Sequence, residues 1–518
     1  MFTQDANTNV IMTRPVKKTD VREVTAEYTL PDYLPDITRL LRVSAKATFP
    51  EKYPGAGNTE YDGRVIFDVV YATGEGEIRC AVFDSEYSGS FPTPEADDFS
   101  CITVSASAEN ASCRLGSPRK LTLKCKLPVS ICISNRKSAD PAIAGNGAEA
   151  QKHMQYRKKT VRYSYEIKAE ETGVPISEDV GTEPSMPQIE RIVFADIRPC
   201  TCEASCSDGK ISYSGSFAAD ILYESADGEY VSFSRDIPVS GELSESGITS
   251  ESIAVCEAEA SNLAFRPQTN ELGETNTVEI DFDCAFYFRV FGNGVCEISS
   301  DAYSLAYETS CEKETFKYLT LESSKNFNFS FSENAELDAD ETERAVCANA
   351  QAQINSVERS GNKTYVSGSV TFHAVLGAGA SFSGKSFSFP FKCETDAGRY
   401  PELFTYTANA YTSDTSARIS GGKIYFDTEI SVSLVIFGEK ETEALRSCTV
   451  FTDRPAENAS SDIILCFPSR ADDLWSIAKK YRTTVDKLAY LNGIGKEQNI
   501  SGALVIPARN MPESFKIR

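Results

Sequence analysis

Sixteen cysteines, two histidines and 75 acidic residues are the side chains of this 518-residue chain that could carry nucleophilic, metal or acid–base chemistry. The densest thiol group, Cys200, Cys202 and Cys206, lacks the spacing of a zinc knuckle and has no His nearby. A nucleophilic Cys needs an imidazole beside it, but His153 lies in a polar connection and His373 in a strand-like pattern. We therefore predict reduced structural thiols, no metal, no cofactor and no enzymatic activity.

Charge and hydropathy limit the partners that the chain can have. Its net charge of −23 argues against nucleic-acid binding, which depends on Lys and Arg neutralising phosphates. No run of about 18 apolar residues is found, so we expect no membrane insertion. The first 15 residues, MFTQDANTNVIMTRP, lack the apolar core of a signal peptide. We therefore expect a cytoplasmic protein.

One sequence pattern occurs three times. The segment LPDITRLLRVSAKA from Leu34 is similar to MPQIERIVFADIRP from Met186 and, more weakly, to ADETERAVCANAQA from Ala339. Alternating apolar residues in a second motif predict a strand with one buried face. A Gly at the start of that strand predicts either a β-bulge or a close approach of another backbone. This second motif begins at Gly63 (GRVIFDVVY), Gly215 (GSFAADILY) and Gly368 (GSVTFHAVL), at offsets of 152 and 153 residues.

Composition and length indicate the fold class. Phe, Tyr, Val and Ile dominate short apolar runs that end in Gly, Asn, Asp or Ser turns, which is typical of strands. One core stops growing near about 250–300 residues, so we expect several domains. We predict a mainly β chain of three tandem, antiparallel, sandwich-like modules, joined like beads by flexible polar connections, and a small βααβ domain. The predicted ranges are 1–136, 137–292 (linker and second module), 293–440, 441–461 (linker), 462–508 and 509–518 (tail).

The last 50 or so residues have a different periodicity. Two buried helical stripes are predicted there, because their apolar residues recur three or four positions apart. Short apolar runs, IILCF and ALVIP, flank the pair and predict two strands. The stripes consist of Leu474, Ile477, Ala478 and Tyr481 in the first helix and of Val485, Leu488 and Leu491 in the second.

This order and its residues resemble the LysM domain family. The resemblance is carried by Asp472, Leu474, Trp475, Ile477, Ala478, Tyr481, Val485, Leu488, Leu491, Asn492, Gly502, Leu504, Ile506 and Pro507. It implies binding of a glycan that contains N-acetylglucosamine, between the first strand–helix loop and the second helix–strand loop. The candidate ligand- or partner-binding residues are therefore Asp472, Asp473, Leu474, Trp475, Asn492, Gly493 and Ile494.

Two departures from the family pattern bear on that ligand. In the first loop, Ala471 and Asp473 stand in place of a Gly and a neutral Thr, and Pro468 interrupts the expected first strand. An unpaired carboxylate buried against a neutral acetamido sugar costs a few kcal/mol. We therefore predict that the module binds a protein partner more strongly than it binds chito-oligosaccharides.

The whole arrangement is similar to clostridial spore-coat morphogenetic proteins, in which SPOCS-type repeats precede one LysM domain. LPDYLPDI at Leu30–Ile37, the repeated Gly-strand motif and the terminal LysM pattern carry this resemblance. It implies a scaffold in the mother-cell cytoplasm at the forespore surface. There it would tether the basal coat layer through a morphogenetic ATPase of the SpoIVA type.

Two other classes also use LysM domains. One is a cell-wall protein or hydrolase that LysM targets to peptidoglycan, and the other is an exported surface adhesin. Carboxylate pairs that could serve a glycosidase arise by chance among 75 acidic residues. Three similar modules without a unique insertion offer no obvious place for one active site, so we favour the scaffold.

Overall fold

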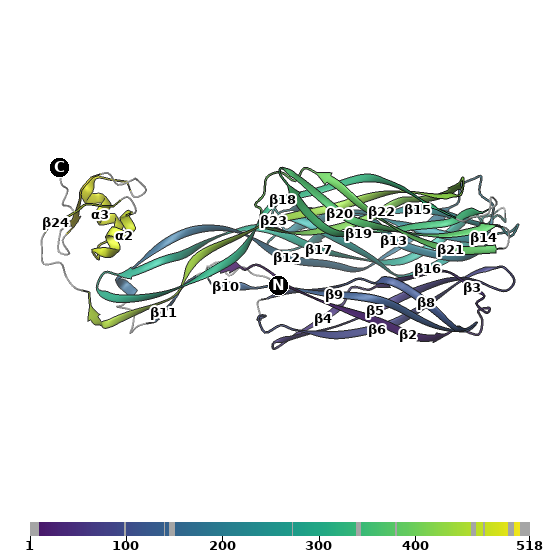
Figure 1. Cartoon of the computed structure of the whole chain (residues 1–518), viewed down its shortest axis with the longest axis horizontal. Helices are drawn as coiled ribbons and strands as arrows, with labels where there is room; N and C mark the ends of the chain where they lie inside the picture. The colour runs from purple at the N-terminus through teal and green to yellow at the C-terminus, as the bar shows by residue number, and fades with distance from the viewer. Residues whose placement is uncertain are drawn as a thin grey trace.

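The structure is a computed structural model that describes residues 10–97, 100–138, 140–144, 151–271, 273–337, 343–378, 381–456, 463–469, 472–495 and 502–507. The predicted positions Ala339 and Ala471 and the predicted tail 509–518 lie outside these residues. The described chain is mainly β, with two short helices near its C-terminal end (Figure 1). The predicted fold class is confirmed.

The first module consists of two antiparallel sheets that enclose one apolar core. In one sheet, β2 (Val16–Thr29), β7 (Cys101–Ala106) and β8 (Glu109–Ser117) pair with β9 (Lys120–Ser134). In the other, β3 (Arg39–Ala47), β4 (Glu51–Gly55) and β6 (Ile78–Pro92) pair with β5 (Asn58–Ala72). The Gly63 motif lies within β5, the central strand of its sheet.

The second and third modules repeat this plan with one central strand per sheet. In the second, β12 (Met154–Gly181) and β16 (Ile253–Gln268) flank β17 (Thr277–Ser304), while β13 (Ile189–Ser207) and β15 (Tyr230–Ser244) flank β14 (Lys210–Ser225). In the third, β18 (Tyr307–Glu336) and β22 (Phe404–Ser420) flank β23 (Lys423–Pro455), while β19 (Arg344–Ser360) and β21 (Ser381–Thr395) flank β20 (Lys363–Ala378).

The repeated glycines are required by close packing. A Cβ on Gly215 would lie 2.5 Å from the carbonyl oxygen of Thr201, and one on Gly368 would lie 2.2 Å from that of Gln353. Both oxygens belong to the neighbouring strand of the same sheet. Of the two predicted alternatives, the close backbone approach is therefore present at Gly215 and Gly368, whereas a Cβ on Gly63 would meet the side chain of Tyr87.

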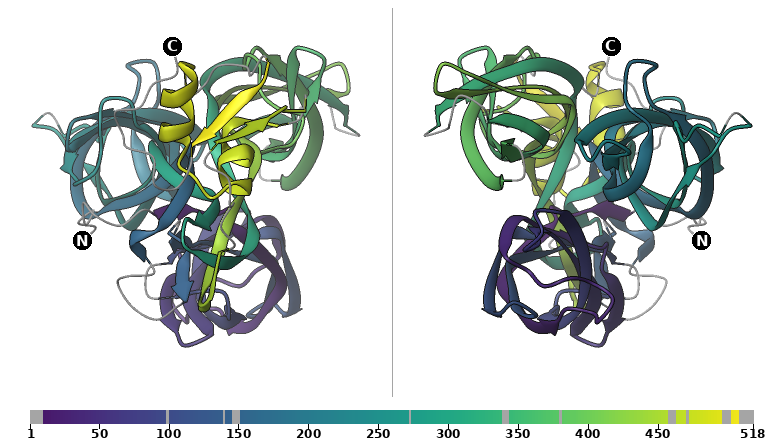
Figure 2. Two further views of the ribbon diagram at one scale, coloured as in Figure 1. Left: turned by 90° about the vertical axis from the view of Figure 1, so that its left-hand side faces the viewer. Right: turned by 90° about the vertical axis from the view of Figure 1, so that its right-hand side faces the viewer.

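The three modules form a closed ring instead of separate beads. Neighbouring modules contact each other through equivalent pairs of strands, which are β6 with β13, β15 with β19 and β21 with β3. The contact of β21 with β3 joins the third module to the first and so closes the ring. Viewed end-on, the modules surround a common axis (Figure 2). The prediction of beads on flexible connections is therefore wrong.

An apolar cluster lies where the modules meet. Its members come from equivalent positions of the three repeats. Because the cluster includes residues of each Gly-motif strand, the face of that strand that points away from its own module's core is also partly buried. Val70, Leu222 and Val375 from those strands are at most 2% exposed. The cluster also contains Leu41, Val193, Val346, Ile78, Tyr230 and Phe382.

Four strands continue beyond the ring and form a two-layered stalk. We define the stalk as residues 154–165 and 292–304 of β12–β17 and residues 307–319 and 439–455 of β18–β23. Small apolar clusters fill the space between these two antiparallel strand pairs. Short strands border the stalk: β1 (Val10–Met12) pairs with β10 (Arg136–Ser138), and β11 (Ala142–Ala144) pairs with β23. Figure 1 shows the stalk leading away from the ring.

The stalk corrects the predicted linkers. Residues 441–455 were expected to be part of a linker, but they form the end of β23 and pair with β18. The other predicted linker is the connection at residues 137–160. Its residues 154–160 begin β12 and pair with β17. Both segments are polar because one face of each strand pair is exposed. A polar composition is also typical of a loop, which is why the sequence predicted linkers here.

The terminal module has the predicted order of elements. It consists of β24 (Ile463–Cys466), α2 (Leu474–Lys480), α3 (Val485–Asn492) and β25 (Leu504–Pro507), with β24 and β25 antiparallel. The predicted apolar stripes pack together, since Leu474, Ile477, Ala478 and Leu488 are at most 4% exposed.

One disulfide departs from the expected reduced thiols. Cys202 of β13 is bonded to Cys256 of β16, so it links the two sheets of the second module. Cys200 and Cys206, the other two members of the dense thiol group, are free.

The ring contact can be tested by removing one side chain of the central cluster. Leu222→Ala should lower the free energy of unfolding by about 3 kcal/mol, because it opens a cavity where no solvent can enter. Val82→Ala is the matched control, since Val82 lies on β6 of the ring and is 62% exposed. Denaturant unfolding measures both variants, and equal effects would contradict the shared cluster.

Candidate functional site

The first candidate loop is organised by Asp473, which is the N-cap of α2. Its carboxylate accepts a hydrogen bond from the Ser476 amide at 2.8 Å, and the Ser476 hydroxyl lies 3.0 Å from the Asp473 amide, so a capping box begins the helix. Asp472 is exposed and accepts from the Ser469 amide at 2.8 Å, which lowers the pKa of Asp472. The loop before α2 is therefore held by both carboxylates.

The second candidate loop is organised by Asn492 at the end of α3. Its side-chain amide donates to the carbonyls of Leu488 and Val505, at 2.9 and 2.8 Å, and its carbonyl accepts from the Val505 amide at 2.7 Å. Gly493 takes the left-handed conformation (φ 62°) that ends the helix. Ile494 packs on the apolar core of the module. Asn492 therefore joins α3 to β25, which fixes the base of this loop.

Trp475 and Lys479 of α2 contact the tip of the stalk. The indole Nε1 of Trp475 donates to Asp301 Oδ2 at 2.8 Å, and Lys479 Nζ lies 2.7 Å from Asp301 Oδ1. Trp475 also packs edge-on against Tyr303, with ring centroids 4.9 Å apart. Asp301 and Tyr303 both belong to β17, so the terminal module is docked on the stalk.

Three more contacts complete this docking. The Tyr303 hydroxyl donates to the Thr483 carbonyl at 2.6 Å, and Tyr303 is fully buried. Arg482 donates to the Ser304 carbonyl at 3.1 Å. Arg157 of β12 forms an ion pair with Asp473 at 2.8 Å. Since Asp473 is paired and caps a helix, the unpaired carboxylate assumed from the sequence is not present.

The seven predicted residues therefore occupy different environments. Asp473 and Trp475 face the stalk, whereas Asp472 and Gly493 are exposed. Leu474 is 4% exposed and belongs to the core of the module. Asp301, Tyr303 and Arg157 were not found by sequence reasoning. They lie more than 170 residues from most of their partners, and no local motif marks them.

Opposing effects set the charge of Asp301. Burial alone would raise its pKa, but the hydrogen bonds from Lys479 and Trp475 outweigh burial and lower the pKa below its ordinary value. The same balance holds for Asp473, whose pKa is lowered by the bonds from Ser476 and by Arg157. Both carboxylates are therefore ionised at neutral pH, as the docking contacts require.

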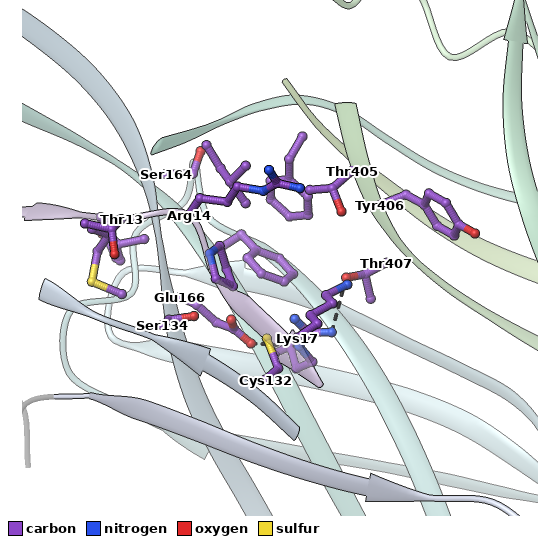
Figure 3. Close-up of a pocket in the computed structure, with 17 residues that line it drawn as sticks. Thr13, Arg14, Lys17, Cys132, Ser134, Ser164, Glu166, Thr405, Tyr406 and Thr407 are labelled. Carbon is purple, nitrogen blue, oxygen red and sulfur yellow. Dashed lines mark hydrogen bonds and ion pairs between the residues drawn. The ribbon is translucent and has the colours of Figure 1, made fainter. Parts of the chain in front are cut away.

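A pocket of about 210 Å³ lies where the three modules meet the stalk (Figure 3). Residues of all three modules line it, among them Cys132, Glu166, Arg289 and Thr407. The Arg289 guanidinium lies 2.7 Å from Glu166 and donates to Thr407 Oγ1 at 3.1 Å, so it joins the second module to the third. Burial raises the pKa of the Cys132 thiol, and no histidine is among the described lining residues. We therefore interpret the ion pair as a structural joint.

The described residues offer neither a metal site nor a membrane-spanning helix. They contain no cluster of three or more His, Cys, Asp or Glu that could hold a metal ion. None of the helices in this part of the chain is long and apolar enough to cross a membrane.

Comparison with known proteins identifies one domain. Residues 470–500, which contain α2 and α3, match the LysM domain family. A LysM domain indicates binding of peptidoglycan or a related glycan. No curated protein and no solved structure matches the chain.

Loss of the Asp301 charge should release the LysM domain. In Asp301→Asn, Lys479 loses its ionic partner, so we expect weaker docking and a red-shifted emission from Trp475, the sole Trp of the chain. Asp227→Asn, in the turn between β14 and β15, is the control. An unchanged spectrum in Asp301→Asn would contradict the docking.

Acidification should have the same effect on the wild-type protein. Because the folded pKa values of Asp301 and Asp473 are depressed, their contribution is present above the unfolded value of about 4 and is lost as the pH falls below it. Trp475 emission should therefore shift as the pH falls below about 4, and the shift should be smaller in Asp301→Asn. Emission that is independent of pH over this range would contradict the assignment.

Proposed function

We propose that this chain is a non-enzymatic scaffold whose LysM domain binds an N-acetylglucosamine-containing glycan at the end of the stalk. The observation that supports the proposal best is the docking of LysM through Trp475, Lys479 and Thr483 onto Asp301 and Tyr303 of β17. A binding domain held far from the ring can contact one surface while the ring contacts another (Figure 1). This arrangement suits a bridge between two structures.

The pairing of Asp473 supports a glycan ligand. The carboxylate accepts from Ser476 and lies 2.8 Å from Arg157, so a sugar bound nearby does not bury an unpaired charge. Asp472 remains exposed on the same loop and can accept hydrogen bonds from sugar hydroxyl groups. The Asp473 carboxylate is therefore no reason for preferring a protein ligand at this loop.

Calorimetric titration of the full-length chain with chito-oligosaccharides tests this part of the proposal. We expect saturable binding that Asp472→Ala weakens about tenfold, because one charge-assisted hydrogen bond to the sugar is lost. Asp486→Ala, in the first turn of α3, is the control and should bind as the wild type does. Absence of binding to both chito-oligosaccharides and peptidoglycan would contradict a glycan-binding LysM domain.

We further propose that the ring acts in spore-coat assembly and contacts a morphogenetic ATPase of the SpoIVA type. The motif that carries this resemblance, Leu30–Ile37, forms a rigid loop at the end of the first module. Arg119 holds the loop by donating to the carbonyls of Pro31 at 2.8 Å and Leu34 at 3.1 Å. Tyr33 at its apex is 85% exposed. An exposed Tyr on a fixed loop is a favourable contact for a protein partner.

Capture of partners from sporulating mother-cell extracts tests the scaffold role. Tyr33→Ala should reduce capture of the ATPase at least tenfold, whereas Tyr53→Ala, at a half-exposed Tyr of β4, should not. The purified chain should release no reducing ends or free amines from peptidoglycan. Equal capture by both variants would contradict the role of the loop, and hydrolysis that is lost on mutation of one carboxylate would contradict the non-enzymatic scaffold.

A further inference from the structure

Two thiols face each other within the stalk. The sulfur atoms of Cys311 and Cys448 are 2.8 Å apart. The residues are directly opposite in the antiparallel register of β18 and β23. Directly opposed residues of such a pair have Cα atoms about 4.5–5.5 Å apart, which is within the range that a disulfide spans. The backbone therefore already holds the two cysteines at a spacing suitable for a covalent bond.

We propose that Cys311 and Cys448 are a disulfide-forming site that locks the stalk beneath the LysM domain. The position of the pair supports this role. Cys311 Sγ lies 3.5 Å from the carbonyl oxygen of Ala302, which stands between the two β17 residues that hold the LysM domain, Asp301 and Tyr303. A disulfide here would join β18 to β23 at the end of the stalk that supports the docked LysM domain.

The two sulfurs differ in exposure and in acidity. Cys448 is fully buried, whereas Cys311 is half-buried and is the one that a reagent can approach. The hydrogen bond from Cys448 lowers the pKa of Cys311 to about 7, although burial opposes the effect, and the same hydrogen bond raises the pKa of Cys448. Lys479 of the docked LysM domain adds a smaller lowering of the Cys311 pKa. Cys311 is thus the attacking thiolate and Cys448 the resolving thiol.

The oxidant is a low-molecular-weight disulfide. The Cys311 thiolate attacks one of its sulfurs, so a mixed disulfide forms and one small thiolate leaves. That thiolate takes the proton of Cys448, whose sulfur then attacks the Cys311 sulfur and displaces the second small thiolate, which takes a proton from water. Two protein thiols are oxidised to one disulfide, and one small disulfide is reduced to two thiols.

The bond would restrain a part of the fold that has little core. The cluster around Cys448 is small and consists of Met154, Ala302, Leu445 and Val450, with Cys311 packed beside it. The pair is separated by 137 residues, so the bond closes a long loop. Closing a long loop removes much chain entropy from the unfolded state. With the disulfide formed, β18 and β23 could not separate while the LysM domain is bound to a ligand.

Peptide mapping of the full-length chain tests the site. The protein is incubated with oxidised glutathione, its remaining thiols are alkylated, and it is digested without reduction for mass spectrometry. Besides the peptide pair joined by the Cys202–Cys256 disulfide, we expect one further pair, which joins Cys311 to Cys448. Cys113, a half-buried thiol whose pKa burial raises to about 11, is the internal control and should be alkylated.

Two variants separate the steps. Cys448→Ser should retain glutathione on Cys311, because the resolving thiol is missing, whereas Cys311→Ser should leave Cys448 without glutathione because that thiol is buried. Alkylation of both cysteines in the wild type, or glutathione left on Cys311 of the wild type, would overturn the proposal. A folded-state circular dichroism spectrum of each Ser variant excludes unfolding as the cause.

Discussion

The arrangement of the whole chain depends on apolar contact along the axis of the ring. Equivalent positions of three repeats supply the cluster, of which Leu41, Val193 and Val346 are one set. Each module has its own core, but each also leaves apolar side chains on the second face of a central strand. Only the ring buries all of these faces, and their exposure to water would cost roughly 25 cal/mol for each Å². Ring closure is therefore the arrangement that this sequence favours.

Ring closure determines where the stalk begins. The second and third modules lie side by side, and β12–β17 and β18–β23 therefore leave the ring as neighbours that can pack on each other. The Glu166–Arg289 pair and Thr407 join the two modules at this point. The stalk then presents Asp301 and Tyr303 to the LysM domain. The position of the candidate glycan loops thus follows from contacts made within the ring.

Much of the local structure could be predicted from the sequence, and much of the assembly could not. The helices of the LysM domain follow from the periodicity of residues such as Leu474 and Ile477, and the repeated strands follow from alternation and from glycine. One feature of the sequence indicates the ring. Val70 and its equivalents add a second, consecutive apolar residue to the alternating pattern, so both faces of the strand are apolar at that point. No feature of the sequence indicates the stalk, because half-exposed strands and polar loops have a similar composition. The Asp301–Lys479 contact joins residues 178 positions apart, which no local pattern reveals.

The central claim is that the modules pack against one another in a ring, and a single amide at the contact between the first and second modules tests this packing. The Ile78 amide of the first module donates to the hydroxyl of Tyr230 in the second, at 3.0 Å. Amide hydrogen exchange of Ile78 in the wild type and in Tyr230→Phe is therefore the decisive measurement. The ring predicts slow exchange in the wild type and clearly faster exchange in the variant, because the acceptor is lost. Equal exchange in both proteins, at the rate of an exposed strand, would contradict the ring.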